Sequence, residues 1–125
     1  MATGMSQERR RTPRITERVR VAIREDTAEL RTETTNLSTA GAYCTLDHPV
    51  SPMTKLRLTF ELPNGSRHVR VRCQGVVVRV EPVIASPERG CYHVAIFFTQ
   101  MSDRDRSAIS RFVRQRLSAS PSTAH

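Results

Sequence analysis

Apolar and polar residues alternate along most of the chain, and this pattern restricts the fold more than any other feature of the sequence. In the clearest segment, 55–62, charged or hydroxyl residues alternate with Leu56, Leu58, Phe60 and Leu62. A period of two puts every second side chain on one face, which is typical of a β-strand with one buried face. Similar patterns predict five more strands, over residues 19–24, 28–34, 42–46, 68–80 and 92–98.

Turn-forming residues separate these strands. The Asn64-Gly65 dipeptide indicates a tight hairpin between two of them. The composition of residues 36–41 predicts another turn. After Gly75 the alternation loses its register, so we expect a bulge or a barrel corner there. The segment 92–98 is apolar on both faces, and we expect it to be central in the sheet or covered by a helix.

The C-terminal segment changes to a helical period. Ser102 is a candidate N-cap with Asp105 three residues later, and an apolar stripe follows at Ile109, Phe112, Val113 and Leu117. Six short strands followed by one helix predict a mainly β protein, a six-stranded antiparallel β-barrel with the helix closing one end.

The length of 125 residues suits one domain, which we place at residues 8–117. We expect residues 1–7 and 118–125 to be disordered. The net charge is +8, and arginines at the two ends carry the excess: residues 1–24 have net charge +5, residues 103–125 have +3, and the segment between them is neutral. Basic ends suit an anionic partner.

The histidines, cysteines and carboxylates form no pattern that indicates catalysis or a metal site. No P-loop, HExxH or GxSxG sequence occurs, and three cysteines without a CxxC pair are typical of reduced thiols. No apolar run approaches the ~20 residues that span a bilayer, and the N-terminus shows no apolar segment of a signal peptide. We therefore expect a cytoplasmic protein that is not an enzyme, does not insert into a membrane, and has no metal or cofactor.

Four arginines lie within six residues ahead of the first predicted strand: Arg9, Arg10, Arg11 and Arg14. A guanidinium group binds phosphate or the O6/N7 edge of guanine through paired hydrogen bonds, and its plane stacks on bases. The same residues can also be a solvated basic tail. We interpret residues 8–17 as an arm that is mobile alone and folds over the barrel when an anionic ligand binds.

The segment 36–41 contains Asn36, Ser38 and Gly41. These residues can serve a turn alone, because Asn and Ser bond to nearby backbone and Gly allows a positive φ. Alternatively, the amide and the hydroxyl can meet the edge of a guanine while Gly41 lets a ligand approach the backbone.

Together, the Arg-x-x-x-Arg pattern of Arg10 and Arg14 and the Asn-x-Ser-x-x-Gly pattern of Asn36, Ser38 and Gly41 resemble the PilZ domain. The resemblance covers residues 8–117, in the order of an arm, six strands and a helix, and it implies a split-barrel type of β-barrel. PilZ domains are bacterial receptors for the second messenger cyclic di-GMP (c-di-GMP). The resemblance therefore implies that these five residues bind that ligand.

In this family, an arginine directly before the first motif arginine is associated with binding of the ligand as an intercalated dimer. The resemblance thus adds Arg9 to the ligand-binding residues and implies c-di-GMP bound as an intercalated pair. Arg79 lies on a strand that lines the pocket in some relatives, but we expect its side chain to be solvated.

The resemblance predicts a cytosolic receptor whose output passes through an effector protein that the sequence does not identify. Two alternatives remain open. A small basic barrel can bind single-stranded nucleic acid, but such barrels stack bases on aromatic side chains, which make up only 5% of this chain, so we do not expect nucleic acid. The chain can also be a PilZ-like protein-interaction module that binds no ligand.

Overall fold

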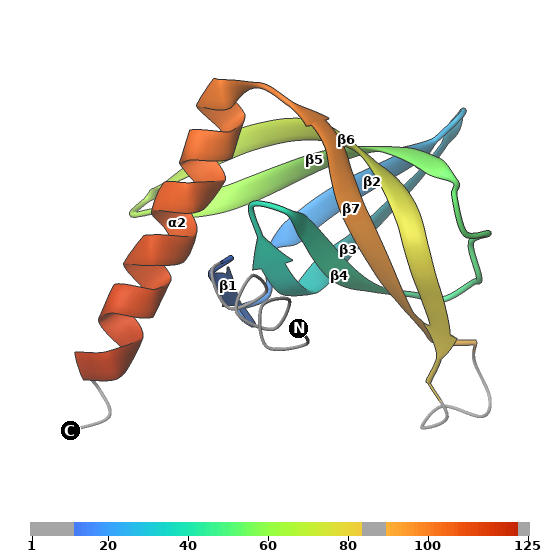
Figure 1. Ribbon diagram of the computed structural model, residues 1–125, viewed down its shortest axis with the longest axis horizontal. Helices are drawn as coiled ribbons and strands as arrows, with labels where there is room; N and C mark the ends of the chain where they lie inside the picture. Colours follow the sequence, from blue (N-terminus) through green and yellow to red (C-terminus); the bar gives the residue numbers. More distant parts are fainter. Residues whose placement is uncertain (1–11, 84–89, 123–125) are drawn as a thin grey trace, which may run out of the picture.

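The chain folds into a closed six-stranded antiparallel β-barrel with one extra short strand and a C-terminal helix (Figure 1). The computed structural model describes residues 12–83 and 90–122. Its barrel strands are β2 (Arg20–Glu25), β3 (Ala28–Ser38), β4 (Gly41–Leu46), β5 (Lys55–Asn64), β6 (Arg67–Pro82) and β7 (Tyr92–Met101). They pair in the order β3-β2-β5-β6-β7-β4, and β4 pairs again with β3. The predicted six-stranded barrel with one helix is confirmed.

The barrel interior is filled by the alternating apolar side chains that the sequence pattern indicated. On β5 these are the four apolar residues of the segment 55–62, all of them buried. Phe60 meets Phe98 of β7 edge to face, with ring centroids 5.6 Å apart. The interior is therefore a packed core, and any ligand of the described residues must bind on the outside of the barrel or at its ends.

Two of the three free thiols belong to this core. Burial raises the pKa of Cys44 to about 12. Burial also raises the pKa of Cys73 to about 12; the nearby Asp105 adds to the rise, whereas Arg106 opposes it. Both thiols are uncharged at neutral pH and pack as small apolar side chains.

The prediction of a turn over residues 36–41 is wrong for its first half. β3 continues to Ser38, because Asn36 and Leu37 pair with Tyr43 and Ala42 of β4 and Leu37 is fully buried. The turn itself is formed by residues 39–40. A β-bulge between Thr34 and Asn36 divides the long strand.

The two other predicted irregularities occur where the sequence indicated them. The β5–β6 hairpin closes with Asn64 opposite Arg67 and with Gly65 at φ 63°. The pairing of β6 with β7 shifts between Gln74 and Gly75, and a second shift follows between Val77 and Arg79. Gly75 is required there, because a Cβ would lie 2.7 Å from Ile96 Cγ2.

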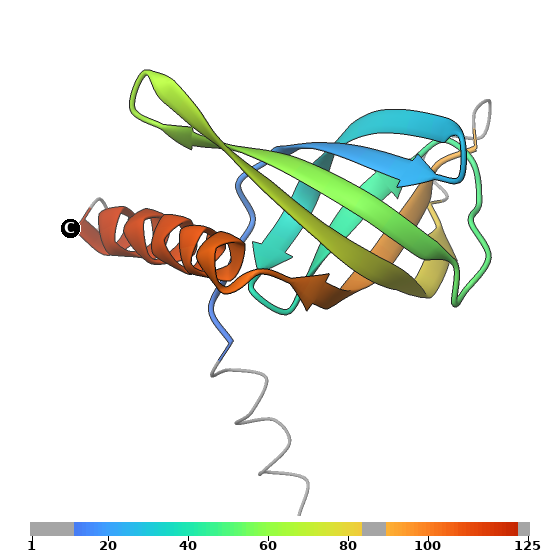
Figure 2. The same cartoon turned by 90° about the horizontal axis from the view of Figure 1, so that it is seen from above.

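Helix α2 (Asp103–Ser122) lies at the end of the barrel from which the β5–β6 hairpin projects (Figures 1 and 2). Ser102 caps it as predicted, since its Oγ accepts a hydrogen bond from Asp105 N at 3.1 Å. Ile109, Phe112 and Val113 are buried against the core, whereas Leu117 is exposed. The helix continues through residues 118–122, so a disordered tail from residue 118 is wrong for this part. No helix in the described ranges is long and apolar enough to span a membrane.

Candidate functional site

The arm ahead of the barrel is fixed against β3. Its short strand β1 (Arg14–Ile15) pairs antiparallel with the end of β3, with Arg14 opposite Ser38 and Ile15 opposite Leu37. Ile15 is buried, which anchors the arm through apolar contact as well as backbone hydrogen bonds. This part of the arm therefore lies on the barrel as a strand of its sheet; its ordering on ligand binding stays a prediction.

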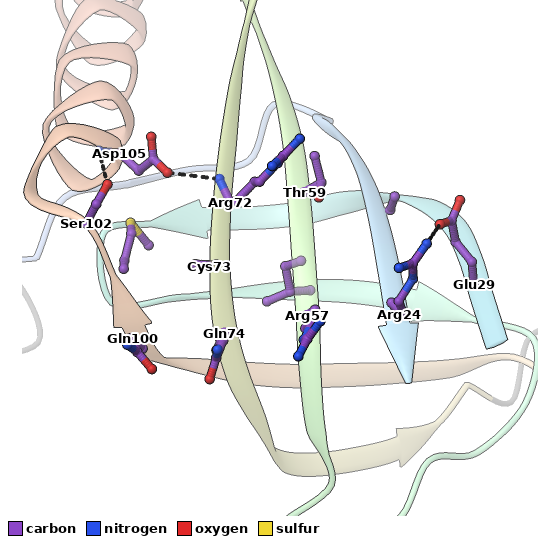
Figure 3. Close-up of a pocket in the computed structure, with 13 residues that line it drawn as sticks. Arg24, Glu29, Arg57, Thr59, Arg72, Cys73, Gln74, Gln100, Ser102 and Asp105 are labelled. Carbon is purple, nitrogen blue, oxygen red and sulfur yellow. Dashed lines mark hydrogen bonds and ion pairs between the residues drawn. The ribbon is translucent and has the colours of Figure 1, made fainter. Parts of the chain in front are cut away.

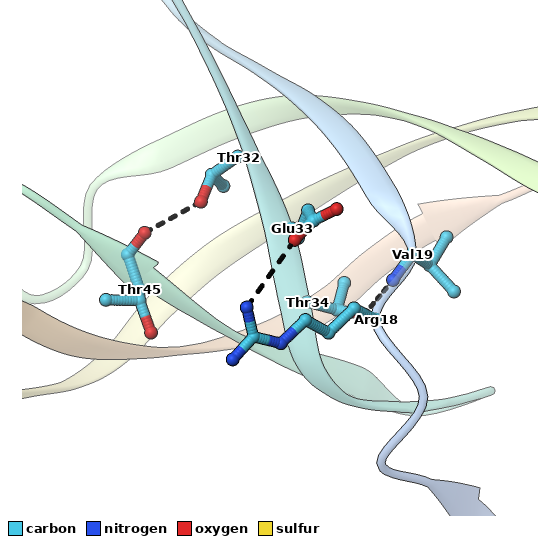
Figure 4. Close-up of polar contacts among 6 residues, drawn as sticks. All are labelled: Arg18, Val19, Thr32, Glu33, Thr34 and Thr45. Carbon is cyan, nitrogen blue, oxygen red and sulfur yellow. Dashed lines mark hydrogen bonds and ion pairs between the residues drawn. The ribbon is translucent and has the colours of Figure 1, made fainter.

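A second anchor lies where the arm enters β2 (Figure 4). Val19 N donates to the hydroxyl of Thr34 at 3.1 Å, and Thr34 N donates to Val19 O at 2.8 Å. Thr34 is fully buried, so its hydroxyl needs this partner. Arg18 extends to Glu33 in an exposed ion pair of 3.8 Å.

A third anchor joins the arm to α2. Glu17 Oε1 accepts from Arg116 Nε at 2.7 Å, and the Arg116 guanidinium lies 4.6 Å from the centre of the Phe112 ring. Phe112 is itself buried against the barrel. The arm is thus held between β3 and the helix, and these contacts set the position of Arg14.

The strand register brings four of the predicted site residues to one outer face of the barrel. Arg14 lies opposite Ser38, and Asn36 precedes Ser38 by two positions on β3, so all three share a face. Asn36 lies opposite Tyr43, which shares its face with Gly41 on β4. We call this surface, defined by Arg14, Asn36, Ser38, Gly41 and Tyr43, the motif face.

The side chain of Ser38 is committed to the turn that follows it. Its Oγ accepts from Ala40 N at 3.1 Å and from Gly41 N at 3.3 Å, and it is only 8% exposed. Arg106 of α2 holds the same turn by donating to Thr39 O at 2.9 Å. Ser38 therefore shapes the rim of the motif face, as expected for a turn-forming serine.

Gly41 is required by close packing of two strands. It lies opposite Phe97 of β7, and a Cβ on it would overlap the carbonyl oxygen of Ile96. Any side chain at this position would push β4 away from β7. The glycine thus keeps the barrel closed and leaves the surface beside the turn free of side-chain atoms.

Arg14 and Asn36 are two polar groups of the motif face that stay available. Arg14 is exposed and Asn36 is half-buried, and neither side chain has a hydrogen-bond or ion-pair partner among residues 12–83 and 90–122. A guanidinium group and an amide side by side can bind a phosphate and the hydrogen-bonding edge of a base.

Sequence reasoning missed two aromatic side chains on this face. Phe97, opposite Gly41, is 51% exposed, and Tyr43 is 42% exposed. The helix does not cover the outer face of β7, so the apolar Phe97 is left in solvent. An exposed aromatic ring is a surface on which a base can stack. The adjacent Phe97-Phe98 pair was the signal, because one member of such a pair must point out of the barrel.

Arg79 lies two strands beyond the motif face, on a cross-strand row that begins at Asn36. Tyr43 lies opposite Ala95, and Ala95 lies opposite Arg79 on β6. Together with Asn36, which lies opposite Tyr43, these residues form one cross-strand row. Arg79 is exposed, as expected, and makes no ion pair with a described residue. The register thus puts an exposed cation at the far end of the cross-strand row that begins at Asn36.

The remaining predicted residues, Arg9 and Arg10, lie outside the described residues, as do the other residues of the arm before position 12. Elsewhere, residues 12–83 and 90–122 hold no cluster of histidine, cysteine and carboxylate side chains that could bind a metal ion.

These features define a small closed antiparallel β-barrel domain with an arginine-bearing arm docked beside a Ser-Gly turn. The PilZ domain family model matches residues 8–115, and the chain belongs to this family. The resemblance found in the two sequence motifs is thereby confirmed.

Three solved structures share this fold. The inhibitor of motility MotI/DgrA of Bacillus subtilis superposes with a TM-score of 0.75 at 20% identity, covering 85% of this chain and 50% of that one. The K. pneumonia MrkH–c-di-GMP complex gives 0.67 at 14% identity, covering 90% and 54%. The PilZ domain with c-di-GMP of YcgR from Escherichia coli gives 0.67 at 15% identity, covering 93% and 97%.

The chain thus spans about half the length of MotI/DgrA and MrkH and nearly all of the YcgR PilZ domain. No curated protein sequence matches this chain.

Proposed function

We propose that this protein is a c-di-GMP receptor and that the motif face is its binding surface. The observation that carries the proposal is the β1–β3 register, which sets Arg14 beside Ser38 on the face that bears Asn36 and Gly41. Membership in the PilZ family and the c-di-GMP complexes of MrkH and YcgR support the same ligand. PilZ domains bind ligands, so we propose no catalysis for this chain. We further propose that the receptor lies in the cytoplasm and that its output passes through an effector protein.

The chemistry of the motif face matches the parts of this ligand. Arg14, together with Arg10 from the arm, supplies guanidinium groups for two phosphates and a guanine edge. Asn36 supplies an amide for the second hydrogen-bonding edge, and the rings of Tyr43 and Phe97 offer apolar surface to a base. Ser38 and Gly41 contribute by fixing the rim on which these groups stand.

Calorimetric titration of the full chain is the direct test. We expect c-di-GMP to bind in about the micromolar range or tighter, and GMP and GTP to bind at least tenfold more weakly, because one guanine and one phosphate cluster engage only part of the face. An oligothymidylate is included because the exposed rings of Tyr43 and Phe97 are what a single-strand binder would use. Tighter binding of the oligonucleotide than of c-di-GMP would replace the receptor assignment, and no heat with any ligand would leave a protein-interaction module.

We further expect two c-di-GMP molecules per chain, bound as an intercalated pair. Arg9 adjoins Arg10 in the sequence and gives a guanidinium plane for the guanine of a second molecule. Arg9→Leu removes that plane and should reduce the ratio to one per chain. Because an exposed Arg–aromatic contact contributes only about 0.5–1 kcal/mol, the ratio measured at saturating ligand is more informative than the affinity. A wild-type ratio of one would refute the role of Arg9 and leave the receptor assignment intact.

A further inference from the structure

The half of the barrel away from the motif face carries a second charged surface, formed by three cross-strand rows on the outside of β2, β5 and β6. The two outer rows are charged: one joins Arg20, Glu61 and Arg70, and the other joins Arg24, Arg57 and Gln74. The middle row consists of Ala22, Thr59 and Arg72. We call this surface the basic groove.

The rows give the basic groove its shape. Ala22 and Thr59 are small and half-buried, so they form a floor between the longer side chains on either side. Two adjoining depressions share this floor, with volumes of about 610 and 560 Å³. Figure 3 shows the larger one, with Arg24, Arg57 and Gln74 along one wall and Arg72 beside Asp105. Arg20 and Arg24 belong to the two outer rows and stand roughly 13 Å apart along β2. One extended polypeptide, which is about 10 Å thick with its side chains, fits between the rows.

Most of the guanidinium groups in the basic groove are unpaired. Among described residues, Arg20, Arg57, Arg70 and Arg72 make no side-chain ion pair, whereas Arg24 pairs with Glu29 at 3.2 Å. Arg24 and Arg57 also lie directly opposite one another on β2 and β5. Like charges opposite each other destabilise a sheet, and a carboxylate placed between them would relieve the repulsion.

We propose that the basic groove binds an extended acidic segment of a partner protein. Four carboxylates line the two depressions, and three of them already have partners: Glu29 pairs with Arg24, Glu33 pairs with Arg18, and Asp105 accepts from Arg72 N. Charge complementarity favours a partner's carboxylates, because the four arginines without an ion pair outnumber the one remaining carboxylate, Glu61. Nucleic acid fits less well, since neither depression is lined by an aromatic ring for base stacking. This inference is independent of the ligand bound at the motif face.

The test uses the full chain and a fluorescein-labelled dodecapeptide of alternating Glu and Ser, followed by fluorescence anisotropy. Arg57→Gln combined with Arg72→Gln should weaken binding of this peptide by about tenfold, because two charge-assisted contacts are lost. The matched control is Arg111→Gln combined with Arg114→Gln, which removes the same charge from exposed positions on α2 and should change affinity less than twofold. A peptide of alternating Gln and Ser should not bind.

Three results would overturn the proposal. One is an equal loss of affinity in the two double variants, which would indicate general attraction to a basic protein. Another is absence of acidic-peptide binding by the wild type. The third is tighter binding of an oligothymidylate than of the peptide, with the oligothymidylate affinity depending on Arg57 and Arg72. Thermal unfolding distinguishes a lost contact from a lost fold, and we expect no decrease in melting temperature for the Arg57/Arg72 variant, since it removes the Arg24–Arg57 repulsion.

Discussion

Replacing Arg14 with alanine is expected to weaken c-di-GMP binding about tenfold or more while the barrel stays folded. The Arg14 side chain is exposed, and its backbone pairing with Ser38 does not depend on the guanidinium group. Losing one bidentate contact to a base edge costs roughly 1–3 kcal/mol. Calorimetric titration of the wild type and Arg14→Ala measures the difference.

The control for Arg14→Ala is Arg67→Ala. Arg67 is exposed at the β5–β6 hairpin, away from the motif face, and its loss removes the same charge. We expect this variant to bind c-di-GMP with an affinity within about twofold of the wild type, because salt screens the effect of a distant exposed charge. Equal affinities of the Arg14 and Arg67 variants would show that Arg14 is not part of the binding surface.

Phe112→Ala is expected to have the largest effect on stability, a loss of about 3–5 kcal/mol in the free energy of unfolding. The ring is 4% exposed where α2 meets the core, and its removal leaves a cavity. The substitution also removes the surface on which Arg116 lies, and Arg116 holds the arm through Glu17. Urea unfolding followed by circular dichroism measures the loss.

Two variants make the Phe112 result specific. Phe112→Leu keeps most of the buried volume and should cost less than about 1.5 kcal/mol. Leu117→Ala truncates an apolar side chain of the same helix that is 39% exposed, so its effect should be much smaller. If Phe112→Ala cost no more than Leu117→Ala, the helix would not be part of the cooperative core.

The strands that the sequence predicted best are those with a long apolar face in the core. On β5 every second residue is buried, so periodicity alone located the strand. The end of β3 was missed because Asn36 and Ser38 are turn-type residues, and their strand conformation comes from pairing with β4 and β1. β1 is two residues long, too short to show a period. The helix end was missed because residues 118–122 carry no apolar stripe.

The candidate site was predictable only in part for a related reason. Motif spacing identified Arg14, Asn36 and Gly41, but their common face depends on strand register, which pairs distant segments. The same holds for Phe97, whose exposure depends on where α2 packs. Ser38 was ambiguous in the sequence, and its hydrogen bonds to Ala40 N and Gly41 N assign it to the turn.

The first turn of α2 touches both halves of the barrel through neighbouring residues. Asp105 Oδ2 accepts from Arg72 N at 3.1 Å at the basic groove. Arg72 comes directly before Cys73, the residue of β6 that pairs with Met101 at the end of β7. Arg106 holds Thr39 at the motif face. Asp105 and Arg106 are neighbours in the sequence, so a displacement of this turn would change both contacts. A ligand on one face that displaces this turn would change the affinity of the other face for its own ligand. By thermodynamic reciprocity, the second ligand would then change the affinity for the first by the same factor.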